Sequence, residues 1–344
     1  MRHLVIIGNG FDLAHGLKTS YKDFIKYIFD NVKDNPTEYK SLINIFTSYM
    51  DYEVATSLIN DSQIGNHLKF NNSLFEKFFR KTIVENWSDV EELYFDELSK
   101  ICKNYSNSKR NDLIKLNKEF ENIIEHLNIY LSHIINQQSE NKIKPFHEFF
   151  EKINNNTTLI LNFNYSNTIS FYLPKKDKQI IDIHGQLNST ENPIIFGFAV
   201  NQSDSEQFLN TGEREFTKYI KRYLYKNSNN EKKLRDFLDI NGDISVTILG
   251  HSCGISDHLI LNQIFTHEKV KSIRIMYFET KEEYLKQCFN IDRIVKDEGV
   301  FSKKIHDFTE SHRLPQVDDG NNQHNNFYSF LETHYKERLP YTFI

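Results

Sequence analysis

Several short apolar segments of this 344-residue chain end in residues that could bind a nucleotide or act on one. The first ends in Gly8-Asn9-Gly10, where glycine would let the backbone approach a pyrophosphate and a following helix would present unpaired N–H groups. Leu13 stands where the usual dinucleotide turn has its third glycine, so the motif also fits a tight structural turn. A carboxylate repels phosphate, so Asp12 is expected to cap the helix or to hold a ribose hydroxyl or a water. The candidate ligand-binding residues here are Gly8, Asn9, Gly10, Phe11 and Asp12.

Two further segments would deliver an amide and an imidazole. The run 159–161 leads to Asn164, and the run 180–183 leads to His184. Ligands bind at the carboxyl ends of strands in open parallel sheets, where both side chains would fall. His184 could then act as a general base near neutral pH, with Asn164 as the second catalytic candidate. Each also has a structural interpretation, since asparagine often bonds the backbone after a strand and a histidine can bond a neighbouring loop.

The last such segment, 246–249, is followed by Gly250, Ser252 and Asp257, which could hold the sugars of a nucleotide. The letters Gly-His-Ser-Cys-Gly at 250–254 also fit the nucleophile elbow of an esterase, with Asp257 and a later histidine completing a triad. That alternative leaves the amino-terminal glycine turn and the histidine of the preceding segment without a role.

The elements that would position these residues have the pattern of an α/β fold. Short apolar runs predict strands at 4–7, 157–163, 179–183, 193–199, 244–250, 272–278 and 303–308. Apolar stripes predict helices after Ser20, which forms a capping box with Asp23, and at 216–225, 231–238 and 281–295. Strands alternating with helices predict a Rossmann-like, mostly parallel sheet with helices on its faces.

A long stretch without the strand pattern predicts an inserted region. Residues 38–150 contain few glycines, one proline and helical spacing of apolar residues. The expected divisions are therefore a nucleotide-binding core at 1–37 and 151–310, the helical insertion, and a C-terminal tail at 311–344 that packs on the core.

Composition argues against several classes of protein. A net charge of −5 without a long basic block does not indicate a nucleic-acid partner. No apolar run approaches the roughly 20 residues of a membrane span, and the amino terminus lacks a secretory pattern, so we expect a cytoplasmic protein without a membrane partner. The three cysteines form no Cys-x-x-Cys pair, so we expect neither a disulfide framework nor a metal site.

In their order along the chain, these motifs resemble the bacteriophage abortive infection AbiH family. The resemblance spans nearly the whole chain and rests on 6–17, Trp87-Ser88-Asp89-Val90-Glu91, 162–166, Ile183-His184-Gly185 and 250–257. It implies a protein of phage defence that responds to an unknown phage-derived trigger. Trp87 is expected to be a packed anchor, whereas Glu91 or Glu92 could reach the active cleft.

The layout is also similar, more distantly, to that of SIR2-like NAD-dependent proteins. Asn164-Tyr165, His184-Gly185 and Phe196-Gly197 stand in the same order as their counterparts there. The resemblance implies NAD as the ligand, with Gly8 and Gly10 at its pyrophosphate. It further implies that Asn164 orients the nicotinamide ribose or the attacking water and that His184 is the general base. Ser252 and Asp257 would hold the adenosine side.

Departures from the SIR2 pattern limit the reaction. SIR2 deacylases carry a zinc module between His-Gly and Phe-Gly, whereas eleven residues without cysteine separate Gly185 from Gly197 here. Ser166 replaces an aspartate, and Lys18 replaces a proline. We therefore expect hydrolysis of NAD or a related nucleotide, held in check by the helical insertion or by the interface of a homo-oligomer. The alternatives are a nucleotide-sensing module without hydrolysis and a nuclease-type effector, for which no paired-carboxylate metal cluster is visible.

Overall fold

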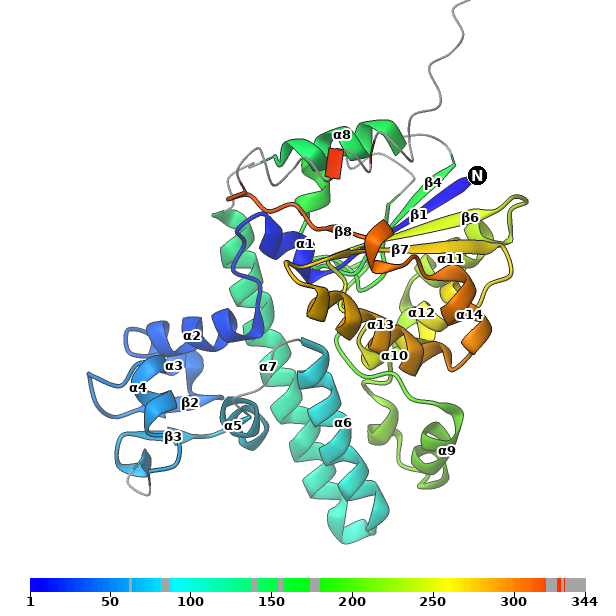
Figure 1. The fold of residues 1–344 in the computed structure, drawn as a ribbon. Coiled ribbons are helices and arrows are strands. Elements are labelled where there is room, and N and C mark those ends of the chain that lie inside the picture. Colours follow the sequence, from blue (N-terminus) through cyan, green and yellow to red (C-terminus); the bar gives the residue numbers. More distant parts are fainter. Residues whose placement is uncertain are drawn as a thin grey trace, which may run out of the picture. The chain divides into compact units, whose positions relative to one another are not determined.

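Strands and helices alternate along the chain, as the apolar pattern predicts (Figure 1). The computed structural model describes residues 1–61, 64–81, 87–137, 142–153, 157–173, 180–319, 327, 328 and 331. The strands are β1 (Arg2–Ile7), β2 (Ile43–Ile45), β3 (Leu68–Phe70), β4 (Thr158–Asn162), β5 (Ile180–Asp182), β6 (Ile244–Leu249), β7 (Val270–Tyr277) and β8 (His312–Arg313). The first α-helices are α1 (Asn9–Ala14), α2 (Tyr21–Asn31), α3 (Pro36–Tyr39), α4 (Tyr52–Ser57), α5 (Ser73–Arg80), α6 (Trp87–Lys103) and α7 (Arg110–Asn136).

The second half of the chain adds further helices and several short 3₁₀ turns. The α-helices are α8 (Lys144–Ile153), α9 (Gln202–Asn210), α10 (Lys221–Leu224), α11 (Asn230–Asp239), α12 (His258–Phe265), α13 (Lys281–Val295) and α14 (Glu298–Lys304). The 3₁₀ turns are η1 (Ile64–Asn66), η2 (Asn107–Lys109), η3 (Thr168–Phe171), η4 (Arg214–Thr217), η5 (Tyr225–Asn227), η6 (Ile255–Asp257) and η7 (Phe308–Glu310). In the part of the chain described, no helix has the length and apolar character needed to cross a membrane.

The chain divides into two compact units, which we call the sheet unit and the helical unit. The sheet unit comprises Met1–Leu17, Gln138–Ile194 and Ser228–Ile344, and the helical unit comprises Lys18–Gln137 and Ile195–Asn227. These bounds differ from the divisions expected from the sequence. Residues 18–37 and 195–227 join the helical unit, and 138–150 join the sheet unit. The expected tail at 311–344 lies mostly outside the described residues.

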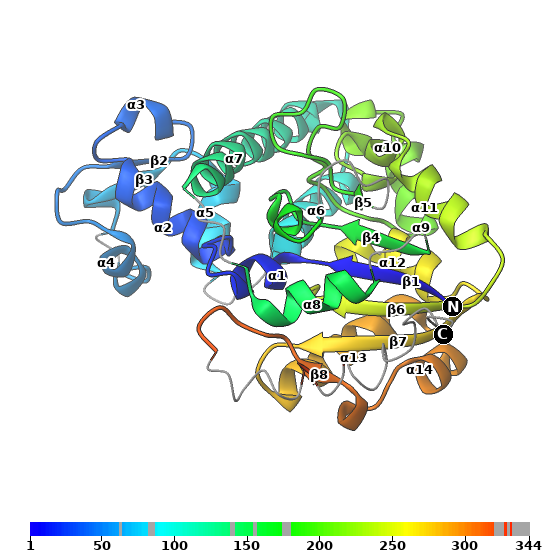
Figure 2. The same cartoon turned by 90° about the horizontal axis from the view of Figure 1, so that it is seen from above.

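Six parallel strands form the main sheet, in the order β5-β4-β1-β6-β7-β8. The chain builds outward from β1 to β5 on one side, returns to β6, and builds outward to β8 on the other. This is the strand order of a doubly wound fold, in which ligands bind where the order reverses, here at the carboxyl ends of β1 and β6. The predicted Rossmann-like α/β fold is confirmed, and Figure 2 shows the central strands side by side.

Helices cover both faces of this sheet, which explains the apolar runs of its central strands. Every residue of β4 and β6 is buried. Figure 1 shows α8 on one face and α11, α12 and α13 on the other. The core beneath α8 contains Phe146, Phe149 and Phe150 and includes Leu314, Phe327 and Leu331 of the C-terminal segment.

The helical unit contains one small sheet as well as its helices. Strands β2 and β3 pair antiparallel. The capping box expected at the start of α2 is present, because Ser20 Oγ accepts from the Asp23 N–H at 3.1 Å and Asp23 accepts from the Ser20 N–H at 3.3 Å. Helices α6 and α7 meet through Tyr94 and Phe120, whose rings stack with centroids 4.0 Å apart.

Two expected strands are wrong, and one expected helix is divided. Residues 193–199 make only an isolated bridge, Phe198 with Ile220, because this apolar segment packs among aromatic rings of the helical unit. Lys303 lies in α14, which Asp297 caps, rather than in a strand. The edge strand of the sheet is β8. The segment 216–225 is divided among η4, α10 and the start of η5, whereas α13 has the predicted bounds.

The turn after β1 and the turn after β6 meet backbone to backbone. The Gly8 N–H donates to Leu249 O at 3.1 Å, and the Gly10 N–H donates to Gly250 O at 2.7 Å. Gly250 has a φ of 64°, which favours glycine. The two strand ends that frame the reversal of strand order are therefore in direct contact.

We expect Gly10→Ala to lower the free energy of unfolding by about 1–3 kcal/mol, the usual cost of overpacking. A Cβ at this position would lie 2.8 Å from both Gly250 Cα and Gly250 O, and backbone atoms cannot rotate aside. Urea denaturation followed by circular dichroism measures the difference. Gly65→Ala is the control, because a Cβ there would meet nothing within 4 Å. Equal stabilities of the two variants would contradict this account.

Candidate functional site

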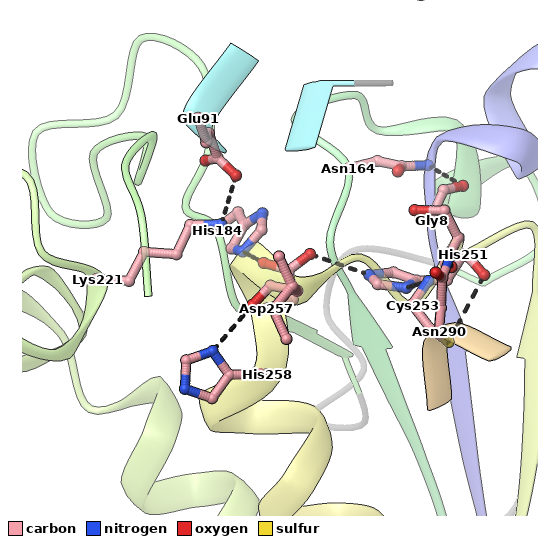
Figure 3. A network of polar contacts seen from close by, with 12 residues as sticks. Gly8, Glu91, Asn164, His184, Lys221, His251, Cys253, Asp257, His258 and Asn290 are labelled. Carbon is pink, nitrogen blue, oxygen red and sulfur yellow. Dashed lines mark hydrogen bonds and ion pairs between the residues drawn. The ribbon is translucent and has the colours of Figure 1, made fainter. Parts of the chain in front are cut away.

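A buried carboxylate between two imidazoles lies at the carboxyl edge of the main sheet (Figure 3). His184 follows β5, His251 follows β6, and Asp257 ends η6. Asp257 Oδ1 is 3.1 Å from His184 Nε2, and Asp257 Oδ2 is 3.5 Å from His251 Nε2. The three residues are between 4% and 8% exposed, so their charges interact with little screening by water.

The backbone determines which nitrogen of His251 carries the proton. The Cys253 N–H donates to His251 Nδ1 at 2.9 Å, so Nδ1 is an acceptor. A neutral His251 therefore carries its proton on Nε2, which faces Asp257. If a neutral His184 donates from Nε2 to Asp257, its Nδ1 is the nitrogen without a proton. The arrangement resembles the way a carboxylate orients a catalytic histidine.

An aromatic side chain separates the two imidazoles. The Phe163 ring meets His184 edge-on with centroids 5.0 Å apart, and meets His251 with centroids 4.3 Å apart. Tyr165 lies nearly parallel to the His184 ring, with a centroid distance of 6.2 Å. These contacts restrict rotation of both imidazoles, so the site is preorganised.

The structure ties Asn164 to the glycine turn. Asn164 Nδ2 donates to Gly8 O at 3.0 Å, and the Asn164 N–H donates to Asn162 Oδ1 at 3.1 Å. The other catalytic candidate, His184, pairs with Asp257. Both candidates follow neighbouring parallel strands, β4 and β5, which places them on the same edge of the sheet (Figure 3).

Asp12 is a second buried carboxylate on this edge. It is 2% exposed and lies in the first turn of α1, and the roles expected from the sequence, a helix cap or a partner for a ribose hydroxyl or a water, stay predictions. Burial raises the pKa of its carboxyl to about 6, and hydrogen bonds from Ser166, Thr168 and Asn164 partly oppose this. Its Oδ1 accepts no hydrogen bond from the described part of the chain.

The remaining residues of the glycine turn face the protein. The Gly8 N–H bonds Leu249 at the end of β6, the Gly10 N–H bonds Gly250 in the turn that follows, and the Phe11 N–H donates to Gly8 O at 2.9 Å. The Phe11 ring lies in the core, 4.9 Å from that of Phe146. The structure thus assigns these glycines a close backbone approach, and nucleotide binding by Gly8, Asn9, Gly10 and Phe11 stays a prediction.

The turn that follows β6 is held by α13. Gln287 Nε2 donates to His251 O and Asn290 Nδ2 donates to Ser252 O, both at 2.8 Å. The strained backbone of a nucleophile elbow is absent at Ser252, because the positive φ belongs to Cys253. Asp257 faces two histidines that precede it in the chain, so the geometry does not favour the esterase alternative.

Glu91 lies within the helical unit in a buried ion pair. Its Oε2 is 3.0 Å from Lys221 Nζ, and its Oε1 accepts from the Gly197 N–H at 3.0 Å. A Cβ on Gly197 would meet Tyr219 O at 2.2 Å, which explains glycine in the Phe196-Gly197 motif. The side chain of Trp87 lies outside what the structure describes, and a role of Glu91 or Glu92 in the cleft stays a prediction.

His251 is the site residue that sequence reasoning missed. It stands inside the Gly-His-Ser motif, but its pairing with Asp257 depends on the turn between β6 and α12. Among the described residues, no group of three or more histidines, cysteines or carboxylates has a geometry that could hold a metal ion. The absence of a metal site therefore stays a prediction for the whole chain.

The raised pKa of Asp12 predicts how stability depends on pH. An unfolded chain ionises this carboxyl near 4 and the folded chain near 6, so unfolding between these values releases a proton. Stability is therefore lost as pH rises through this window. Asp12→Asn cannot ionise at this position. Its free energy of unfolding, relative to that of the wild type, should therefore rise by roughly 3 kcal/mol at most between pH 4 and 7.

Denaturation at several pH values measures this difference. Asp112→Asn is the matched control, because the side chain of Asp112 is 57% exposed on α7. If the difference in free energy of unfolding between Asp12→Asn and the wild type does not change with pH, the carboxyl of Asp12 has the same pKa in the folded and the unfolded chain.

Comparison with known proteins agrees with the motifs. A search of curated proteins finds no match to this chain. The model of one family, described as bacteriophage abortive infection AbiH, matches residues 4–279. The match spans the site residues from Gly8 to Asp257 and confirms the family expected from the sequence. The chain belongs to the bacteriophage abortive infection AbiH family.

Proposed function

We propose that this abortive-infection protein hydrolyses NAD or a related nucleotide when a phage-derived trigger releases its activity. The observation that carries the proposal is the buried pairing of His184 with Asp257 at the ligand-binding edge of a doubly wound sheet. A buried histidine oriented by a carboxylate is a typical general base, and nucleotides are common ligands at this edge.

In the proposed reaction, His184 takes the proton of the attacking water. Asp257 accepts the Nε2–H of the imidazole and stabilises the imidazolium that forms when Nδ1 is protonated. The Nε2–H of His251 points at the other oxygen of the same carboxylate and so keeps it oriented. His184 is thus the base, and Asp257 and His251 position it.

Asn164 and Asp12 would act on the ribose side. The amide of Asn164 is anchored on Gly8 O, which holds it at the strand end to orient the ribose or the water. The Oδ1 of Asp12, which has no partner in the described chain, would accept a ribose hydroxyl after a local rearrangement exposes this buried carboxyl. Ser252 would hold the adenosine side, as the SIR2-like layout implies, whereas the pairing of Asp257 with His184 favours the positioning role over the adenosine side that the layout implied for it.

This chemistry suits a site without a strong acid. Nicotinamide leaves NAD as a neutral molecule because the ring nitrogen is already cationic in the substrate. The transition state is oxocarbenium-like, and a positioned water with a base completes the hydrolysis. One histidine with its carboxylate therefore suffices.

We expect His184→Ala to lower NAD hydrolysis at least about 100-fold, the usual contribution of a general base. Release of nicotinamide by purified protein mixed with extract of infected cells is measured by chromatography, and NAD is measured in cells with and without phage infection. His147→Ala is the control, since His147 is 46% exposed on α8 of the same unit. NAD should fall only in infected cells that contain the wild type or the control.

Other outcomes separate the alternatives. Thermal stabilisation by NAD without turnover, also in extract of infected cells, would contradict hydrolysis and indicate a nucleotide sensor. Unchanged NAD with protection retained and with degraded nucleic acid would indicate a nuclease-type effector.

Asp257→Asn should lower kcat about tenfold or more and change KM less, because the amide cannot stabilise the imidazolium. Steady-state kinetics on the folded variant measure both constants. Asp239→Asn is the control: Asp239 also faces a histidine, His267 at 3.8 Å, but its side chain is 76% exposed. A change confined to KM would assign Asp257 to substrate binding instead.

A further inference from the structure

Helix α13 of the sheet unit is apolar on two faces. Its inner face buries Tyr284, Cys288, Ile291, Ile294 and Val295. Its outer face exposes Leu285 at 52% and Phe289 at 62%. Residues four apart lie one above the other on a helix, so these two side chains form a continuous apolar stripe. Single exposed apolar residues are common, but an aligned pair of this size is typical of a contact surface.

Charged residues extend the stripe in both directions. Glu282 lies three residues before Leu285, and Arg293 lies four residues after Phe289, both exposed on the same face. The Arg293 guanidinium carbon is 5.8 Å from the centroid of the Phe289 ring. The helix dipole explains acidic and basic ends, but it does not explain the exposed leucine and phenylalanine between them.

This order of residues is self-complementary. If a second copy of α13 packs antiparallel about a two-fold axis near Gln287, Leu285 meets Phe289 of the second copy. The same axis places Glu282 near Arg293 of the second copy, because the midpoints of the two pairs lie within half a residue of each other. A parallel arrangement would instead place like charges together. Closed two-fold contacts require a patch that complements itself in this way.

We propose that the outer face of α13 is a homodimer interface in which two copies of this helix pack antiparallel. Leu285 and Phe289 form its apolar centre, and Glu282 with Arg293 form its charged ends. One helix pair buries less surface than a standard interface of about 1,600 Å², so the dissociation constant is expected on the order of micromolar.

The interface helix is also the helix that holds the site. Gln287 and Asn290 of α13 bond the carbonyl groups of His251 and Ser252. Pairing of α13 would therefore brace the turn that carries His251. This inference goes beyond the proposed hydrolysis, and its test requires no NAD.

Sedimentation velocity over a concentration series tests the interface with the full-length chain. The wild type should shift from monomer to dimer, and Leu285→Glu should raise the dissociation constant at least about tenfold, since each 1.4 kcal/mol corresponds to one factor of ten. Leu209→Glu is the control, because Leu209 is also 52% exposed. Circular dichroism and the melting temperature confirm that each variant folds.

A charge exchange tests the antiparallel register. Glu282→Lys and Arg293→Glu should each weaken the dimer by placing like charges together, and the double variant should restore it. A wild type that stays monomeric at about 100 µM, well above a micromolar dissociation constant, would overturn the proposal. A dimer that tolerates Leu285→Glu, or a double variant weaker than either single one, would overturn it equally.

Discussion

The backbone contact between the turn after β1 and the turn after β6 is the constraint on which the site depends. A Cβ on Gly8 would lie 2.5 Å from His251 Cα, and a Cβ on Gly250 would lie 2.3 Å from the Phe11 nitrogen. Side chains at these positions would therefore separate the two strand ends and move His251. The glycines that resemble a phosphate-binding turn here serve first to bring two strands and their polar residues together.

This contact places a carboxylate where its burial can be compensated. A buried charge is costly unless it is paired and hydrogen-bonded, and Asp257 has an imidazole nitrogen near each oxygen. Phe163 and the Cys253 N–H restrict the imidazoles in turn. Asp12 differs, because hydrogen bonds offset its burial only in part and its carboxyl has a pKa near 6. Two carboxylates on one edge of the sheet therefore have different environments, as acid–base sites commonly require.

Helix α13 connects this site with the surface of the sheet unit. Its inner face packs on the core and bonds the turn of His251, and its outer face carries the apolar stripe. The two faces belong to one helix, whose backbone hydrogen bonds leave few alternative arrangements. The proposed dimer thus has a physical route to the proposed reaction, although each can be tested without the other.

The sequence by itself determined the elements with strong local signals. The strands β1 and β6, the helix α13 and the capping box at Ser20 follow from largely apolar segments, helical spacing and cap chemistry, which act over a few residues. The same rules failed at 193–199, because an apolar run does not say whether it packs in a sheet or among helices, and at 303–308, because helix α14 extends to Lys304. The family and the Rossmann-like fold class could also be predicted from the sequence, since both depend on the order of motifs and elements along the chain.

Only the tertiary structure decided which residues face one another. His184 and Asp257 lie far apart in the chain, and their pairing depends on the strand order and on the turn through η6. The tertiary structure likewise brought His251 next to Asp257. It paired the N–H groups of Gly8 and Gly10 with carbonyl groups at the end of β6, and it left the outer face of α13 exposed. These are relations between distant segments, and local propensity does not encode them because each segment could adopt the same conformation beside different neighbours.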